Sequence, residues 1–209
     1  MALRTLNITI KGTSALMTHN GNMADPLNPI VQSLKKISSK RTKVERDHLL
    51  MSQLELLGGV YPEHDLTNEE DPGFIVSDDK VELTGNWGNC MVPEHVIEAT
   101  IINGAKKRRK GTAFKAGMRV TSPSFIMVNE QPITVEEVFK NRKYKLTSRV
   151  NVNNSAIMRT RPLFPNWHIN FDCLLDDEVV NMNDLQEALE DAGRLVGLGD
   201  WRPRFVSLL

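Results

Sequence analysis

Two stretches of the chain alternate apolar and polar residues with a period of two, which is the pattern of a half-buried β-strand. Near the start of the chain the apolar positions of this pattern are Leu6, Ile8 and Ile10. In the last third of the chain they are Trp167, Ile169, Phe171 and Cys173. The pattern therefore predicts strands over residues 5–11 and 167–173. Because the aromatic residues of the second strand share a face with Ile169 and Cys173, we expect them to be buried.

Four other stretches carry apolar residues at the three- and four-residue spacing of an amphipathic helix. They cover about residues 29–37, 44–57, 93–110 and 183–196. Pro29 stands at the first position of the first helix, and Gly58-Gly59 closes the second. Short strands are predicted at 89–93, 118–120, 125–128 and 145–152, with a last strand over residues 204–209.

The order of these elements predicts an α+β fold. When residues from about 60 to 145 are set aside as an insertion, a β-α-β-β-α-β pattern remains. That pattern is the ferredoxin-like or RRM-like arrangement, a four-stranded sheet with two helices on one face. The sequence thus predicts one RRM-like domain over residues 1–209, with a large helical and β-hairpin insertion at about 60–145.

Composition narrows the class of protein. Of the 209 residues, 40% are hydrophobic and 25% charged, which is ordinary for a globular domain. Cys90 and Cys173 belong to no CxxC or Cys/His cluster, so neither a structural zinc nor a disulfide framework is expected. No signal peptide and no run of 18 apolar residues stands out, which favours a cytoplasmic protein without a membrane span.

The formal net charge is zero, but the charges are segregated along the chain. Residues 106–161 hold 14 Lys and Arg against three acids, whereas residues 62–98 hold ten acids against one base. Residues 176–200 hold eight acids against one base. Basic surface of that density attracts phosphate backbones. The alternative is that the acidic and basic segments neutralise each other, within the fold or between subunits.

The strongest local signal is a run of five cations at the end of the predicted third helix. Cations suit the C-terminus of a helix, but five in a row repel one another, so an anionic partner would stabilise them. The alternative is a solvated helix end. The run consists of Lys106, Lys107, Arg108, Arg109 and Lys110, and Lys115 follows shortly after it.

A second group of cations is interleaved with Asn and Ser over residues 142–161. Guanidinium groups bind phosphate through two parallel hydrogen bonds, and Asn and Ser donate to phosphate, sugar or base edges. The alternative is an ordinary surface hairpin. The cations are Arg142, Lys143, Lys145, Arg149, Arg159 and Arg161.

Two loops complete the candidate nucleic-acid site. Gly197 and Gly199 let the backbone approach a ligand closely, although Gly197 could be no more than the residue that ends a helix. Arg202 and Arg204 flank that turn. His19 and Asn20 lie in the loop after the first strand, where a histidine more often serves a structural hydrogen bond. No P-loop, GxSxG or HExxH motif is present, so no enzymatic activity, cofactor or metal is predicted.

Three segments together resemble a known family. They are ITIKGTSALMTHNGNMADPLNP, SRVNVNNSAIMRTRPLFPNW and LVGLGDWRPRF. The combination resembles the RAMP superfamily of CRISPR effector subunits, which have RRM-like cores, and especially the backbone subunits that polymerise along guide RNA. It also looks like a group of small phage-encoded proteins with the same signatures. The family's glycine-rich loop is typically GxGxxxGxG, of which this chain keeps Gly197 and Gly199.

The resemblance implies a non-catalytic protein that binds single-stranded RNA or DNA and self-associates into filaments. It implies that a β-hairpin in the segment 142–161 presses between nucleotides, with Ile157 or Met158 as the wedge. Two alternatives stay open. One is a metal-independent endoribonuclease of the RAMP type, with His19 as general acid or base. The other is a phage inhibitor that mimics a subunit of a CRISPR filament.

Overall fold

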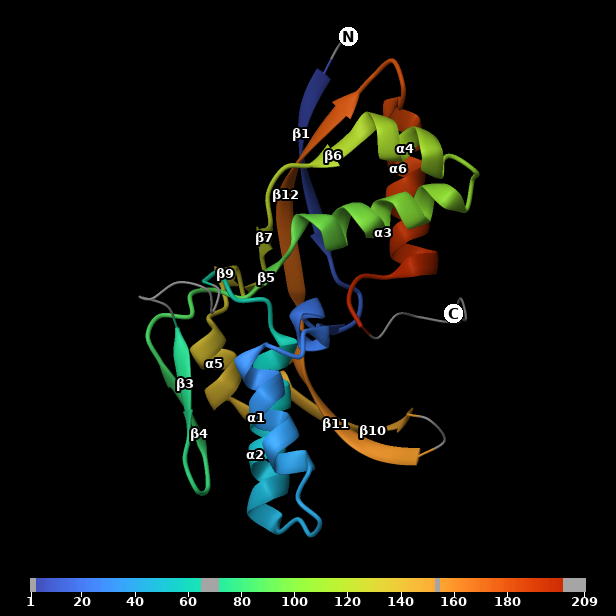
Figure 1. The fold of residues 1–209 in the computed structure, drawn as a ribbon. Helices are drawn as coiled ribbons and strands as arrows, with labels where there is room; N and C mark the ends of the chain where they lie inside the picture. The colour runs from blue at the N-terminus through green and yellow to red at the C-terminus, as the bar shows by residue number, and fades with distance from the viewer. Residues whose placement is uncertain (1–2, 65–71, 153–154, 201–209) are drawn as a thin grey trace. The chain divides into compact units, whose positions relative to one another are not determined.

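A computed structural model describes residues 3–64, 72–152 and 155–200 (Figure 1). The protein is 39% helical and 32% strand, with antiparallel sheets, which confirms the predicted α+β class. The chain divides into two compact units, each described by itself below. Unit 1 consists of the described residues within 1–16, 92–127 and 166–209, and unit 2 of those within 17–91 and 128–165. Three two-residue strands span the boundaries between these segments: β2 (Leu16–Met17), β5 (Met91–Val92) and β8 (Met127–Val128).

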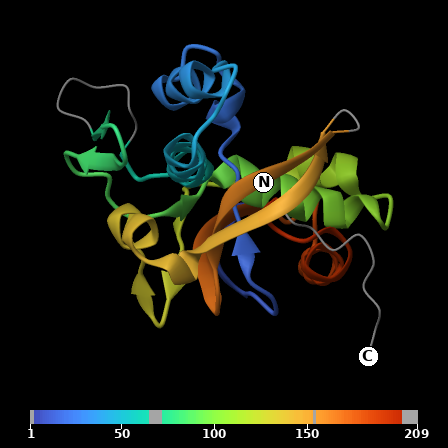
Figure 2. The ribbon, with the colours of Figure 1, turned by 90° about the horizontal axis from the view of Figure 1, so that it is seen from below.

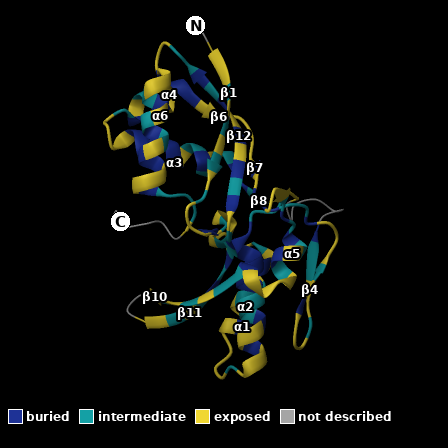
Figure 3. Cartoon of the chain, turned by 180° about the vertical axis from the view of Figure 1, so that it is seen from behind, coloured by how far each residue is buried: buried dark blue, intermediate teal, exposed yellow. Residues whose placement is uncertain are grey.

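Unit 1 is built on a long antiparallel strand pair. Strand β1 (Leu3–Lys11) pairs with β12 (Trp167–Asp176), with Ile8 opposite Phe171. The short strand β6 (Met118–Val120) pairs with the C-terminal half of β12, at Cys173–Leu175. Every second residue of β12 is buried, as the alternation predicts, and Figure 3 shows little exposed surface along this strand. The buried positions are Trp167, Ile169, Phe171, Cys173 and Leu175.

Three helices complete unit 1: α3 (Glu94–Lys106), α4 (Gly111–Gly117) and α6 (Met182–Asp191). A π-helical turn, η3 (Ala192–Val196), continues α6 directly. Asn181 caps α6 by accepting from the backbone N–H of Asp184 at 2.9 Å. Where α3 crosses α6, a Cβ on Gly104 would lie 2.3 Å from the carbonyl oxygen of Ala188. The absence of a side chain at position 104 is therefore what lets the two helices approach.

Unit 2 contains a pair of helices and two β-hairpins (Figure 2). Helix α1 (Pro29–Ser38) packs on α2 (Glu45–Gly59), and α2 packs on β11. The hairpins are β3 (Gly73–Val76) with β4 (Val81–Thr84), and β10 (Lys145–Val152) with β11 (Ser155–Phe164). The smaller elements are η1 (Gly21–Ala24), β9 (Gln131–Pro132), α5 (Val135–Lys140) and η2 (Arg142–Tyr144).

Several predicted boundaries are wrong in detail. The third predicted helix ends at Lys106, because Arg109 adopts a left-handed conformation (φ 62°) that turns the chain toward α4. The strand predicted over 125–128 is interrupted, with β7 (Ser124–Phe125) and β8 on either side of Ile126. Helices α4 and α5 are missing from the prediction, because seven and six residues are too few to show a helical period. The predicted strand over 204–209 lies outside the described residues.

The described helices include none that is both long enough and apolar enough to cross a membrane.

Candidate nucleic-acid interface

The predicted site residues fall in both units. The run of cations at the end of α3, Lys115, Gly197 and Gly199 belong to unit 1, and the other described site residues belong to unit 2. Arg202 and Arg204 lie outside the described residues.

Two cations of the run pair with acids of α6. The Arg108 Nε atom lies 2.7 Å from Asp191 Oδ2, and the Lys110 Nζ atom lies 2.6 Å from Asp184 Oδ1. Glu187 lies 3.3 Å from Arg108 and 3.7 Å from Lys110. For these two cations the alternative interpretation, neutralisation within the fold, is what the structure shows.

The pKa values of these groups follow the same contacts. The hydrogen bond from Arg108 is the largest cause that lowers the pKa of the Asp191 carboxyl, and Arg194 adds to it. The hydrogen bond to Asp184 raises the pKa of Lys110. Asp191 and Lys110 are therefore charged near neutral pH, and their ion pairs tie the end of α3 to α6.

The remaining cations of this region are exposed. Lys106 donates to Asn103 Oδ1 at 2.9 Å, on its own helix. Lys107, Arg109 and Lys115 are exposed and form no ion pair with another described residue. Among the predicted site residues of unit 1, these four cations are accessible to a phosphate backbone.

The two glycines follow the turn η3, which continues α6. Gly197 and Gly199 have φ angles of 75° and 91°, and both follow η3. The N–H of Gly197 donates to the Ala192 carbonyl at 2.8 Å, so Gly197 does end the helix, as one of the two interpretations held. Asp191, which pairs with Arg108, lies six residues before Gly197, so one cation of the run contacts the helical segment that Gly197 ends.

In unit 2 the most accessible part of the predicted site is the β10–β11 hairpin. Figures 1 and 2 both show the two strands side by side as one extended ribbon. Arg149 lies directly opposite Met158, and both are exposed, Met158 to 60%. Val150 lies opposite Ile157, and both are half-buried. A cation and an apolar side chain thus stand next to each other on the outer part of the hairpin.

The base of the hairpin is fixed by a buried carboxylate. Glu55 of α2, 5% exposed, pairs with the Arg159 guanidinium and accepts from the backbone N–H of Thr160 at 2.8 Å. The Thr160 hydroxyl lies 2.9 Å from that of Ser52 and 3.1 Å from that of Thr147. Arg159 is therefore occupied by a structural contact, unlike Arg149.

The other cations of this region lie near the start of β10. Lys143 lies over the Tyr144 ring at 4.5 Å and 3.9 Å from Glu137. Burial lowers the pKa of Lys145, and the neighbouring Arg142 lowers it further. Arg142 is exposed, whereas Arg161 is half-buried and donates to the Thr160 carbonyl at 3.2 Å.

The loop after the first strand is held by backbone contacts. The Tyr61 hydroxyl donates to the His19 carbonyl at 3.0 Å, and the Asn20 amide donates to the Val60 carbonyl at 2.9 Å. The Asn20 oxygen also accepts from Asn22 N–H and caps η1. Asn20 thus serves the loop's own structure, while His19 is exposed.

The described residues contain no cluster of three or more His, Cys, Asp or Glu side chains that could hold a metal ion. Both cysteines are buried. Burial raises the pKa of Cys173 to about 11 and raises that of Cys90 as well. Neither thiol is therefore suited to act as a nucleophile near neutral pH.

Sequence reasoning overlooked a third cationic surface, at the turn between α1 and α2. Lys40 donates to Asp47 at 2.6 Å, and Asp47 also accepts from the Val44 N–H at 3.0 Å, which fixes the turn. The exposed cations around it are Lys35, Lys36, Arg41 and Arg46. The signal was present as the basic stretch KKISSKRTKVER, but lay outside the segment with the highest charge density.

Comparison of the chain with protein-family models and with curated proteins gives no match.

Proposed function

We propose that the protein binds single-stranded RNA or DNA in the cytoplasm, through the phosphate backbone and without catalysis. The observation that carries the proposal is the β10–β11 hairpin with its exposed Arg149 and Met158. Residues 138–171, which contain this hairpin, hold seven Lys and Arg and no acid. An extended, acid-free hairpin with an exposed cation beside an exposed apolar side chain suits contact with phosphates and insertion between bases.

The strand order and helix packing of unit 1 support a ferredoxin-like or RRM-like fold, which is part of this proposal. Its strands are ordered β1-β12-β6, and α3 and α6 pack against each other. In a ferredoxin-like sheet the third strand lies between the first and the second. If α3 is the first helix, then β1, β6 and β12 are the first, second and third strands, and the order β1-β12-β6 matches that arrangement. The inserted residues would then be 17–91 and 128–165 instead of the predicted 60–145.

Self-association of the protein along the bound nucleic-acid strand is part of the same proposal. Acids of α6 are engaged by Arg108 and Lys110, so the acidic surface of residues 176–200 is partly consumed within unit 1. Asp78 and Asp79, at the turn between β3 and β4, are exposed. They are the acids we assign to contact with a neighbour's basic surface, in the filament-forming manner that the RAMP resemblance implies.

Fluorescence anisotropy with labelled single strands of RNA and of DNA tests the proposal. We expect binding at low salt, with log affinity falling by about 0.7 per phosphate neutralised for each unit of log salt. Arg149→Ala combined with Met158→Ala should weaken binding. The matched control is Lys11→Ala with Met182→Ala, an exposed cation and an exposed methionine in unit 1.

Two results would contradict the proposal. Absence of binding at low salt, or an affinity that does not change with salt, would argue against phosphate recognition. Cleaved strands after incubation, with or without EDTA, would argue against a non-catalytic role and in favour of the nuclease alternative.

A further inference from the structure

One face of helix α1 is not used for packing on α2. Pro29, Gln32, Ser33 and Lys36 follow the spacing i, i+3, i+4 and i+7, so they form one stripe along the helix. The buried residues of α1 are instead Ile30, Val31 and Ile37. Because the stripe includes an amide, a hydroxyl and an ammonium group, it is not a second core face of the helix.

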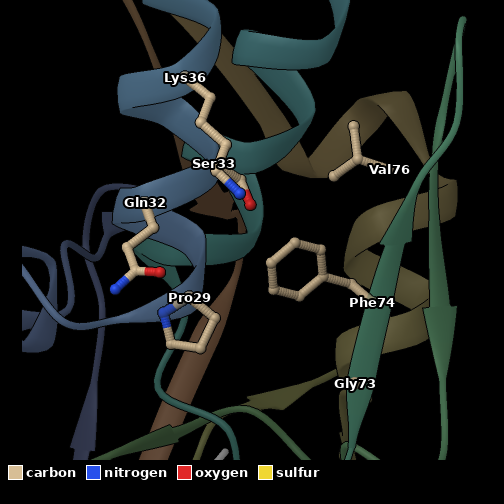
Figure 4. Close-up of a pocket in the computed structure, with 7 residues that line it drawn as sticks. All are labelled: Pro29, Gln32, Ser33, Lys36, Gly73, Phe74 and Val76. Atoms are coloured by element: carbon tan, nitrogen blue, oxygen red, sulfur yellow. The ribbon is translucent and has the colours of Figure 1, made fainter.

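The stripe lines a cleft of about 480 Å³ that β3 closes on the other side. Phe74 and Val76 are two residues apart on β3 and therefore point to the same face of the strand. Figure 4 shows the Phe74 ring pointing from β3 toward α1. The cleft thus has an aromatic ring on one wall and a polar helix face, ending in Lys36, on the other.

Contacts with the rest of unit 2 hold both walls. The indole N–H of Trp87, which is buried, donates to the Gly73 carbonyl at 3.1 Å, directly beside Phe74. The backbone N–H of Val81 in β4 donates to Gln53 Oε1 of α2 at 2.8 Å. Since α1 packs on α2 and the β3–β4 hairpin is tied to α2, the cleft exists without a ligand.

The lining chemistry suits a planar group joined to an anion. The Phe74 ring, with Pro29 and Val76, offers an apolar surface for stacking, and Gln32 and Ser33 offer hydrogen bonds to polar edges. Lys36 offers a positive charge, and none of the lining residues described for the cleft is acidic. Lys36 also begins the cationic surface that continues through Lys35 and Arg41 to the α1–α2 turn.

We propose that this cleft receives one nucleotide of the bound strand, with its base stacked on Phe74 and its phosphate at Lys36. This inference rests on the proposed function. It gives the strand a base-binding point on α1 and β3, separate from the β10–β11 hairpin, and a path for its backbone along the α1–α2 turn.

Phe74→Ala tests the stacking contact. We expect it to weaken binding of a labelled single strand by about 5- to 150-fold, the range for loss of one base–aromatic stack. Phe74→Trp should retain the affinity. Ile75→Ala is the matched control, because Ile75 is 54% exposed and points to the opposite face of β3. On an abasic strand, which has no base to stack, the difference in affinity between the wild type and Phe74→Ala should be smaller.

Lys36→Gln tests the phosphate contact on an exposed residue whose change does not disturb the core. The slope of log affinity against log salt should become shallower by about 0.7. Lys11→Gln, an exposed cation of unit 1 that lies outside the α1–α2 turn, is the control and should leave the slope unchanged. Melting curves identify any variant that fails to fold. If Phe74→Ala does not fold, Lys36→Gln with its control and Phe74→Trp still test the proposal.

The outcomes separate the two proposals. If the wild-type protein binds no strand at low salt, both the proposed function and the cleft assignment are wrong. If it binds, and Phe74→Ala and Lys36→Gln match their controls on ordinary and abasic strands, the cleft assignment alone is overturned. If Phe74→Ala lowers the affinity for an acidic peptide but not for a strand, the cleft belongs to a protein partner.

Discussion

At the scale of single residues, Arg149 and Arg159 show how two arginines of one hairpin differ in role. They are ten residues apart on paired strands, and in the sequence both count simply as cations of a basic segment. The structure separates them, because Glu55 reaches Arg159 and leaves Arg149 exposed. No local pattern links Glu55 to Arg159, since the two residues lie 104 positions apart.

Arg159→Ala should lower the free energy of unfolding by about 1–3 kcal/mol, the cost of leaving a buried acceptor without its partner. Glu55 would remain buried and keep the hydrogen bond from the Thr160 N–H. Urea denaturation measures the effect. Arg149→Ala is the control, with a change within about 0.5 kcal/mol because its side chain is exposed. Equal stability of the two variants would show that the Glu55 contact contributes little.

The pH dependence of stability should report on Asp191. Its folded-state pKa is lowered below the ordinary value of 3.8, mainly by Arg108, so the carboxylate binds protons more weakly in the folded protein. The stabilisation is therefore complete above that value and is lost as the pH falls below it. Between pH 5 and pH 3 the melting temperature should fall more steeply for the wild type than for Asp191→Asn. Parallel curves would contradict this assignment.

At the scale of elements, the sequence predicts what depends on local pattern. The strands around Ile8 and Phe171 and the helices α1, α2 and α6 are confirmed, because each is long enough to show its period. The short helices α4 and α5 are not predictable in this way. The cleft beside Phe74 was also missed, because it depends on a helix and a strand more than 30 residues apart in the chain.

The α3–α6 crossing gives a prediction at the same scale. Gly104→Ala should destabilise the protein by about 1–3 kcal/mol, because its Cβ would meet the Ala188 carbonyl and the helices would have to separate. Gly193→Ala, in η3, is the matched control, since no atom lies within 4 Å of a Cβ built there. Thermal unfolding of both variants measures the difference. A neutral Gly104→Ala would mean that the helices can shift without loss.

At the scale of the whole molecule, the structure accounts for part of the charge segregation seen in the sequence. Part of the acidic segment 176–200 is consumed by the end of α3, through Asp184 and Asp191. The sequence left neutralisation within the fold open as one alternative, and only the fold shows which cations form the ion pairs. Lys107, Arg109 and Arg149 remain exposed, and so do Asp78 and Asp79. In the filament proposed above, these exposed charges of opposite sign would meet between neighbouring copies.

The last prediction follows from those remaining charges. Light scattering of the protein on single strands of increasing length should show particles whose mass grows with strand length. Asp78→Lys combined with Asp79→Lys should reduce this growth, because like charges would then face each other between neighbouring copies. The same variant should bind a strand long enough for one copy at least as tightly as the wild type, since two cations are added. Glu45→Lys with Glu190→Lys is the control for charge alone, because these two exposed acids lie outside the β3–β4 turn. Unchanged growth in the Asp78 and Asp79 variant would place the contact between copies elsewhere on the molecule.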